Sequence, residues 1–313
     1  MNTLEEYLEG FGSPQYQLSE GPYNPIATAW WQTFISKGSS GVGWFPMLAC
    51  CFPQLCLDQK EGISKSDHYR QSVLRGISSG IMNYIPEQPA ALTVGMAEHW
   101  VGQVPVISTP SRNDFEFVVR ALAFRSEPVN IRSGVHAHAL SGLINWGIIR
   151  ESGPQLRTQL IIQHESPYGS IGADLVPGNL TDDEWIRASS VLRLEHELTH
   201  IATKRVYGLA RPNLLDELTA DAMGMIKALG FFSADLFREC LGVGKDRKIN
   251  AEARVTEYLC DLSGPDADMA LSYCLDRAEE LESLLNKQGV TFNEDRELFY
   301  WLTSKRLDNP WHE

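Results

Sequence analysis

The sequence lacks an apolar stretch long enough to cross a membrane. Its most apolar run, residues 42–57, contains Pro46 and Pro53 and is shorter than the ~20 residues of a spanning helix. The acidic first residues also lack the basic and apolar regions that define a signal peptide. We therefore expect a cytoplasmic protein that has no membrane partner.

Positive charge and cysteine are both in short supply. The chain has 27 Lys and Arg against 40 Asp and Glu, a net charge of −13. Because such a surface repels phosphate backbones, we expect no nucleic-acid partner. The 6 cysteines contain no Cys-x-x-Cys pair, which is typical of reduced thiols and excludes a disulfide framework.

The signatures of several enzyme classes are missing as well. No Gly-x-Ser-x-Gly elbow occurs, which argues against a serine hydrolase of the α/β type. Residues 242–246 read Gly-Val-Gly-Lys-Asp, but Asp246 stands where a phosphate-binding loop needs Ser or Thr. Internal repeats and low-complexity tracts are absent too. What remains is an ordinary globular chain of 313 residues, enough for one large or two packed domains.

The first part of the chain is rich in Gly, Pro and aromatic residues. This composition predicts short helices joined by long loops up to about residue 130. A helix is expected at residues 111–125, with Ser111 or Asn113 as its cap. A strand is expected at residues 158–165, where apolar and polar side chains alternate as in a partly exposed strand.

Strong helical signals begin near residue 181. Thr181 and Glu184 have the spacing of a capping box, which predicts a helix from there to about residue 207. Gly208 is the expected stop of that helix. Asn213 can cap a second helix that ends near residue 230.

Helical patterns continue to the end of the chain. Further helices are expected at residues 233–241, 250–262, 266–288 and 293–306. The fold class is therefore predicted to be α+β and mainly helical. We expect two regions, a loop-rich one at residues 1–130 and a metal-binding one at residues 131–313.

The helix predicted from residue 181 carries the sequence His196-Glu197-Leu-Thr-His200. Histidines at i and i+4 lie one turn apart on the same face, so both imidazoles can reach one metal ion. Glu197 is offset from His196 by about 100° and can lie beside the ion without binding it. A carboxylate there is a suitable general base for a zinc-bound water, whose pKa is ~7. The pattern therefore indicates a catalytic metal site.

A third protein ligand is needed, and Glu217 in the second helix is the candidate. The short connection lets this helix fold back on the first, so Glu217 can complete a two-His, one-Glu site with one position left for water. Asp221 lies four residues later on the same face. It can accept the free ring N–H of a ligating histidine, which fixes the tautomer and strengthens the ligand.

These two segments resemble the gluzincin metallopeptidases over about residues 184–225. That family has an HExxH helix followed by a second helix with a Glu ligand, often within E-x-x-A-D. The residues Glu217-Leu-Thr-Ala-Asp221 match every fixed position of that pattern. No segment before residue 180 carries a resemblance to a known family.

The resemblance implies a zincin-like fold for the C-terminal half and a zinc ion in it. The implied ligands are His196, His200 and Glu217. By the same resemblance Glu197 would be the general base, and Asp221 would bind a ligating histidine.

The sequence departs from the gluzincin pattern at two points. Arg193 replaces a small or β-branched apolar residue and lies one turn from Glu197, where an ion pair would reduce the basicity of the carboxylate. Gluzincins also place a His or Tyr downstream, where it stabilises the oxyanion. The candidates here are His312, Tyr258, Tyr273 and Tyr300, and the sequence does not choose among them.

Together these features predict a zinc-dependent hydrolase with one Zn²⁺ per chain, acting on a peptide or other small amide. Two alternatives stay open. The same two histidines and carboxylate could hold Fe²⁺ in a non-haem oxidoreductase, although such an enzyme has no obvious need for Glu197. The chain could also be a non-catalytic metal-binding domain, and the intact Glu197 argues against that. The identity of the substrate, endo or exo cleavage, and the oligomeric state are open.

Three further histidines call for an interpretation. His136 and His138 alternate and would share one face of a strand, and His164 lies at the end of another. They could line a cleft over the metal, whose second wall would be residues 1–130. A structural role is the better interpretation, because no third ligand accompanies them.

Overall fold

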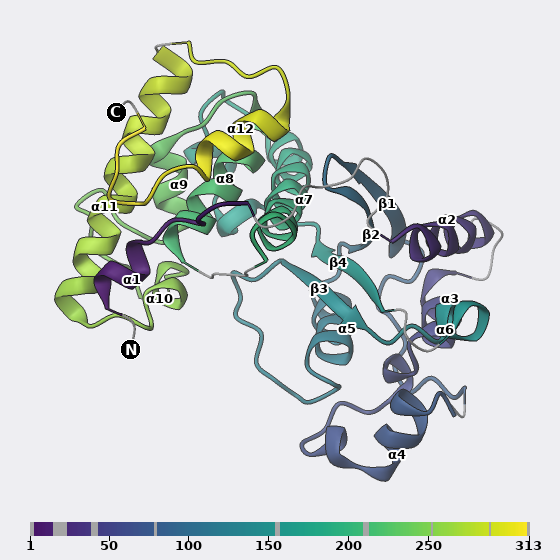
Figure 1. The fold of residues 1–313 in the computed structure, drawn as a ribbon. Helices are drawn as coiled ribbons and strands as arrows, with labels where there is room; N and C mark the ends of the chain where they lie inside the picture. The colour runs from purple at the N-terminus through teal and green to yellow at the C-terminus, as the bar shows by residue number, and fades with distance from the viewer. Residues whose placement is uncertain are drawn as a thin grey trace. The chain divides into compact units, whose positions relative to one another are not determined.

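The protein has a mixed α+β fold that is mainly helical, with one four-stranded sheet in the described part of the chain (Figure 1). This confirms the predicted fold class at that level. None of the described helices combines the length and apolar character that a membrane crossing requires. The structure is a computed structural model and describes residues 3–14, 24–38, 43–77, 80–153, 157–208, 213–251, 253–287 and 289–311.

The chain divides into two compact units. We call residues 19–165 the sheet unit, and residues 1–18 together with 166–313 the helical unit. The boundary after residue 165 lies later than the expected boundary after residue 130, because the strands of residues 137–164 belong to the same sheet as those of residues 93–109.

The four strands of the sheet unit have the order β1-β2-β4-β3. Antiparallel pairs join β1 (Thr93–His99) to β2 (Gly102–Thr109) and β3 (Ala137–Leu143) to β4 (Thr158–His164). The central pair, β2 and β4, is parallel, with Val106 opposite Ile161. The strand predicted at residues 158–165 is confirmed as β4.

Strand β4 is more buried than its alternating pattern predicted. Leu160, Ile161 and Ile162 have no exposed surface, because β4 lies inside the sheet and is covered on both faces. Helix α5 (Arg112–Ala123) packs on this strand, and Ser111 caps it by accepting a hydrogen bond from the N–H of Asp114, as predicted.

Short helices complete the sheet unit, as its composition predicted. They enclose an aromatic core in which the indole N–H of Trp31 donates to the Thr158 hydroxyl over 2.7 Å. The longer of them are α2 (Pro25–Gly38), α3 (Trp44–Cys51) and α6 (Trp146–Ser152), and α4 (Asp67–Tyr69) is a single turn.

The helical unit is built around two long helices. Helix α7 (Asp182–Tyr207) begins with the predicted capping box at Thr181 and ends at Gly208, which has a left-handed conformation. Helix α8 (Leu214–Leu229) begins at Asn213, whose side chain accepts from the N–H of Asp216. Both predicted helices are confirmed.

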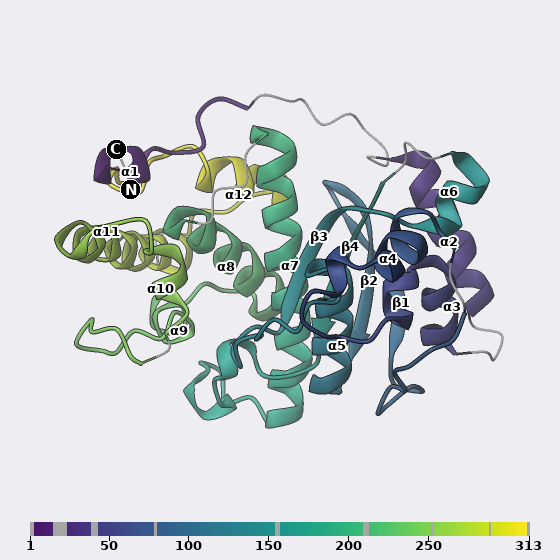
Figure 2. The same ribbon diagram turned by 90° about the horizontal axis from the view of Figure 1, so that it is seen from below.

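A glycine lets α7 and α8 approach closely. A Cβ atom on Gly224 would lie 2.7 Å from the carbonyl oxygen of Leu192, in the middle of α7. Figure 2 shows α8 between α7 and α11 (Gly264–Glu282), and α12 (Asp295–Leu302) also packs against it. Every residue from Leu214 to Met225 is therefore buried, including three carboxylates.

The remaining helices of this unit are shorter than predicted in two places. Among the described residues of the range 250–262, where one helix was expected, α10 (Val255–Tyr258) is the helical segment, and α12 ends before residue 306. Helix α9 (Ala234–Cys240) agrees with its predicted range. Helix α1 (Leu4–Leu8) belongs here because the Tyr7 hydroxyl donates to the carbonyl of Tyr258 and accepts from the N–H of Leu214, both over 3.0 Å.

Candidate metal centre

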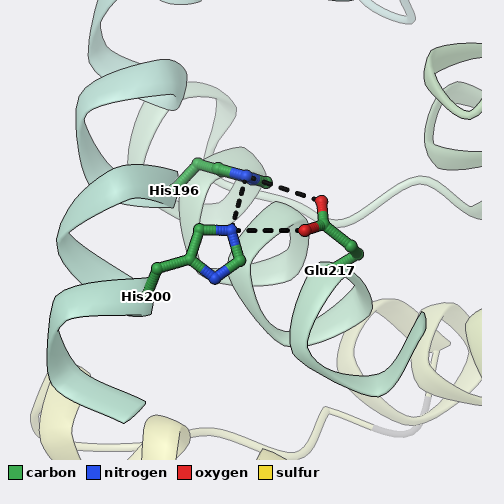
Figure 3. Close-up of side chains that lie close together, drawn as sticks. All are labelled: His196, His200 and Glu217. Atoms are coloured by element: carbon green, nitrogen blue, oxygen red, sulfur yellow. Dashed lines mark hydrogen bonds and ion pairs between the residues drawn. The ribbon is translucent and has the colours of Figure 1, made fainter. Parts of the chain in front are cut away.

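Two histidines of α7 and one glutamate of α8 point toward a common centre (Figure 3). The Nε2 atoms of His196 and His200 are 2.9 Å apart. His200 Nε2 is 3.4 Å from Glu217 Oε1, and His196 Nε2 is 3.6 Å from Glu217 Oε2. Among the described residues, this is the one group of three or more His, Cys, Asp or Glu side chains with the spacing of metal ligands.

The spacing of these atoms fits a small tetrahedral ion. Ligand atoms that lie ~2.0–2.1 Å from a tetrahedral zinc are separated from one another by about 3.3–3.4 Å. The three observed separations of 2.9, 3.4 and 3.6 Å bracket that value. The side chains would therefore need only small adjustments to hold such an ion.

The second ring nitrogen of each histidine is bound to a carboxylate of α8. His196 Nδ1 lies 2.7 Å from Asp221 Oδ1, and His200 Nδ1 lies 2.8 Å from Asp216 Oδ2. A carboxylate accepts, so each Nδ1 carries a proton and each Nε2 is the ring atom turned toward the centre. The two Nε2 atoms lie 2.9 Å apart, a contact that either a proton or a metal cation between them would stabilise.

The charges around the centre also call for a cation. Asp216, Glu217 and Asp221 are 3%, 4% and 0% exposed. Arg254 binds two of these three carboxylates, so with both histidines neutral, as metal ligands have to be, the group carries a net charge of −2. Buried charges are costly unless they are compensated, and a divalent cation would balance this site.

The pKa values reflect the same crowding of charges. Burial by itself would lower the pKa of His200, but the carboxylates of Asp216 and Glu217 outweigh it and raise that pKa well above its usual value. Burial would raise the pKa of Glu217, but the two histidines and Arg254 lower it to about 2. Glu217 is therefore ionised, as a metal ligand has to be.

Arg254 and two tyrosines surround the carboxylates. The Arg254 guanidinium donates to Asp221 Oδ2 over 2.8 Å and to Glu217 Oε2 over 3.3 Å. Tyr168 donates its hydroxyl proton to Asp221 Oδ1 in a short hydrogen bond. Burial raises the pKa of Tyr258 well above its usual value, and the nearby charges of Glu217 and Asp221 raise it further. Both tyrosines are therefore protonated at neutral pH.

Glu197, the expected general base, is half-buried on α7 next to His196. Its neighbour Arg193 is buried, and the guanidinium donates to the carbonyl of Ser166 over 2.9 Å. Burial lowers the pKa of Arg193 to about 10, and the charge of Glu197 acts in the opposite direction. The two side chains predicted to interact are therefore electrostatically coupled, while Arg193 also anchors the segment before Tyr168.

Sequence reasoning missed three members of this group: Asp216, Arg254 and Tyr168. Asp216 had a signal, because it precedes Glu217 and the first turn of α8 faces α7. Tyr168 begins the 3-10 turn Tyr168–Ser170 and Arg254 directly precedes α10, both outside the two motifs, and no local pattern marks them. Of the tyrosines left open, Tyr258 is the one that interacts with Glu217. His312 lies outside the described residues.

The other three histidines of interest belong to the sheet unit. His136 Nδ1 and His164 Nδ1 are 3.0 Å apart, and the two rings stack. Arg112 Nη1 lies 3.3 Å from His136 Nδ1, a position unfavourable to a metal cation. His138 packs against the ring of Phe124. These contacts favour the structural interpretation.

The chain matches a protein family described as a family of unknown function (DUF7005), over residues 11–159 and 155–307. The matched ranges include both units and all the residues of the candidate centre. No curated protein and no solved structure matches the chain.

Proposed function

We propose that this chain, which belongs to the DUF7005 family, is a zinc-dependent hydrolase that cleaves a peptide or another amide bond. One observation carries the proposal. The Nε2 atoms of His196 and His200 meet the carboxylate of Glu217, while both Nδ1 atoms are bound to buried carboxylates. The sequence resemblance to gluzincins also supports the proposal, and it implies a zincin-like fold for the helical unit.

The donor set favours zinc. Two imidazole nitrogens and one carboxylate oxygen form a known catalytic zinc set, which leaves a position open. A zinc ion held there would polarise the scissile carbonyl and lower the pKa of the attacking water. Iron also accepts two histidines and a carboxylate, but the half-buried Glu197 beside His196 has a role in hydrolysis and no obvious role in oxygen chemistry.

The side chains of this chain would then carry the proton transfers. Glu197 takes a proton from the attacking water as the oxygen adds to the carbonyl carbon. The same carboxyl group returns that proton to the leaving nitrogen when the C–N bond breaks, so the products are an acid and an amine. Tyr258, which is protonated and interacts electrostatically with Glu217, is our candidate for the hydrogen-bond donor to the developing oxyanion.

The first experiment compares the wild-type protein with Glu197→Gln. We expect one zinc per chain in both, measured by elemental analysis after expression without added metal, because Gln is nearly isosteric and no ligand changes. Cleavage of a peptide mixture, followed by mass spectrometry, is expected to fall by about 10²-fold or more when the general base is lost.

The matched control is Glu195→Gln, a buried glutamate on the same helix that is neither a ligand nor the proposed base. It is expected to keep both metal and turnover. Iron in the wild-type protein together with an O₂-dependent product, or undiminished hydrolysis by Glu197→Gln, would refute the proposal.

A further inference from the structure

Arg254 lies outside both sequence motifs, yet it reaches the centre of the site. Its Nη2 atom donates to Asp221 and to Glu217, and its Nη1 atom donates to the Tyr168 hydroxyl over 3.0 Å. Asp221 in turn binds His196, and Glu217 faces both histidines. One guanidinium therefore touches the proposed ligand from α8 and the carboxylate that orients a ligand from α7.

The guanidinium is held in place independently of any ion. It lies over the rings of Tyr168 and Tyr258, with its central carbon 5.6 and 5.8 Å from the two ring centres. The backbone on its C-terminal side is fixed too, because the N–H of Val255 donates to the carbonyl of Leu241 over 3.0 Å. Gly242 permits this path, since a Cβ there would lie 2.7 Å from the Cβ of Ala253.

We propose that Arg254 is a positioning residue of the metal centre, which fixes Glu217 and Asp221 in the orientations that binding a divalent cation requires. The inference rests on the proposed metal site. Arg254 does not touch substrate or ion in this role. It acts through two buried carboxylates of α8 that would otherwise repel each other.

The sign of the effect distinguishes positioning from simple charge. A guanidinium next to a dication repels it, so by charge alone the loss of Arg254 would strengthen metal binding. Positioning predicts the opposite. Without the two-pronged contact, Glu217 and Asp221 lose their fixed orientations, and His196 loses a firmly held acceptor. Disturbing such partners of the ligands weakens metal binding by about 10- to 100-fold.

The test measures zinc affinity by competition with a chromophoric chelator for the wild-type protein, Arg254→Met and Arg254→Lys. We expect Arg254→Met to bind zinc about 10- to 100-fold more weakly. Arg254→Lys keeps the charge but not the planar fork, so we expect an intermediate affinity. Circular dichroism would show whether Arg254→Met folds. If it does not, the zinc affinity of Arg254→Lys decides the test.

Arg238 provides a matched control in the same unit. It is 7% exposed, and it binds Asp235 over 2.9 Å and the carbonyl of Val243 over 2.8 Å. Arg238→Met removes a buried guanidinium without touching the site, so its zinc affinity is expected to stay within about 2-fold of wild type.

A second readout is the visible absorption of the Co²⁺-substituted protein, which reports the ligand arrangement without any turnover. We expect altered bands for Arg254→Met and wild-type bands for Arg238→Met. Equal or tighter zinc binding by Arg254→Met, or an unchanged cobalt spectrum, would overturn the inference. Wild-type protein that binds no metal would overturn both this inference and the proposed function. Metal binding without hydrolysis would overturn the function alone.

Discussion

Asp216 and Asp221 have the same relation to the two histidines but different surroundings, and this predicts different consequences of their loss. Asp216 binds His200, and its Oδ1 atom is buried without a hydrogen-bond partner among the described residues. Asp221 binds His196 and also Tyr168 and Arg254. We therefore compare Asp216→Asn with Asp221→Asn, which change charge and keep shape.

The expected magnitudes follow from these contacts. Both changes weaken the hold on one histidine, so zinc affinity should fall by roughly 10-fold or more in each, as is usual for partners of metal ligands. Losing one partner of a buried ion pair costs ~3–5 kcal/mol. We expect about 2–3 kcal/mol for Asp221→Asn, because the Arg254 side chain is 22% exposed and keeps Glu217 as a partner.

Asp216→Asn should change stability much less. The charge-assisted bond to His200, about 1.5–3 kcal/mol, becomes a weaker neutral one, and this loss is offset by the removal of a buried negative charge next to Glu217. A net change of about 0–1 kcal/mol remains. Urea unfolding of the metal-free proteins measures the stabilities, and chelator competition measures the affinities. Equal destabilisation by the two variants would refute the reasoning, and so would unchanged zinc affinity in either.

Two further predictions follow from packing and exposure. Gly224→Ala should gain ~1 kcal/mol of stability from helix propensity. It should lose about 1–3 kcal/mol, because the new Cβ would meet the Leu192 carbonyl of α7. Urea unfolding should therefore show a net loss of stability, and zinc binding should be weaker. Net stabilisation would contradict it. Iodoacetamide at pH 8 should label the exposed Cys50 and Cys260 before the buried Cys51, because burial raises the pKa of Cys51 to about 12. Mass spectrometry of the peptides would show the order of labelling, and early labelling of Cys51 would contradict the prediction.

Local sequence patterns were enough to predict the two helices that form the candidate centre. The capping box at Thr181, the stop at Gly208 and the cap at Asn213 each act within one helical turn, so their outcome does not depend on the rest of the fold. The separation of four residues between His196 and His200 likewise fixes their common face. Because the connection between the two helices is short, the sequence also predicted that Glu217 would meet the two histidines.

Features that depend on distant packing were predicted less well. The alternation in β4 indicated one exposed face, but the sheet is covered on both faces there, so Leu160, Ile161 and Ile162 are all buried. The boundary between the units follows residue 165 and not the expected residue 130, because strand pairing joins residues 137–164 to the earlier strands. The proposed second cleft wall at residues 1–130 and the zincin-like architecture stay predictions.

The charge balance of α8 explains why the sequence motif alone does not describe the site. Folding buries Asp216, Glu217 and Asp221 within two turns of one helix, which would strongly oppose folding if all three stayed uncompensated. Arg254, which lies outside both motifs, compensates one charge, and a divalent ion would compensate the other two. The motif thus names the proposed metal ligands, whereas the fold decides how many negative charges surround them. In such a site ion binding and folding are linked, since an ion at 100 times its dissociation constant adds about 2.7 kcal/mol to the stability of the folded state.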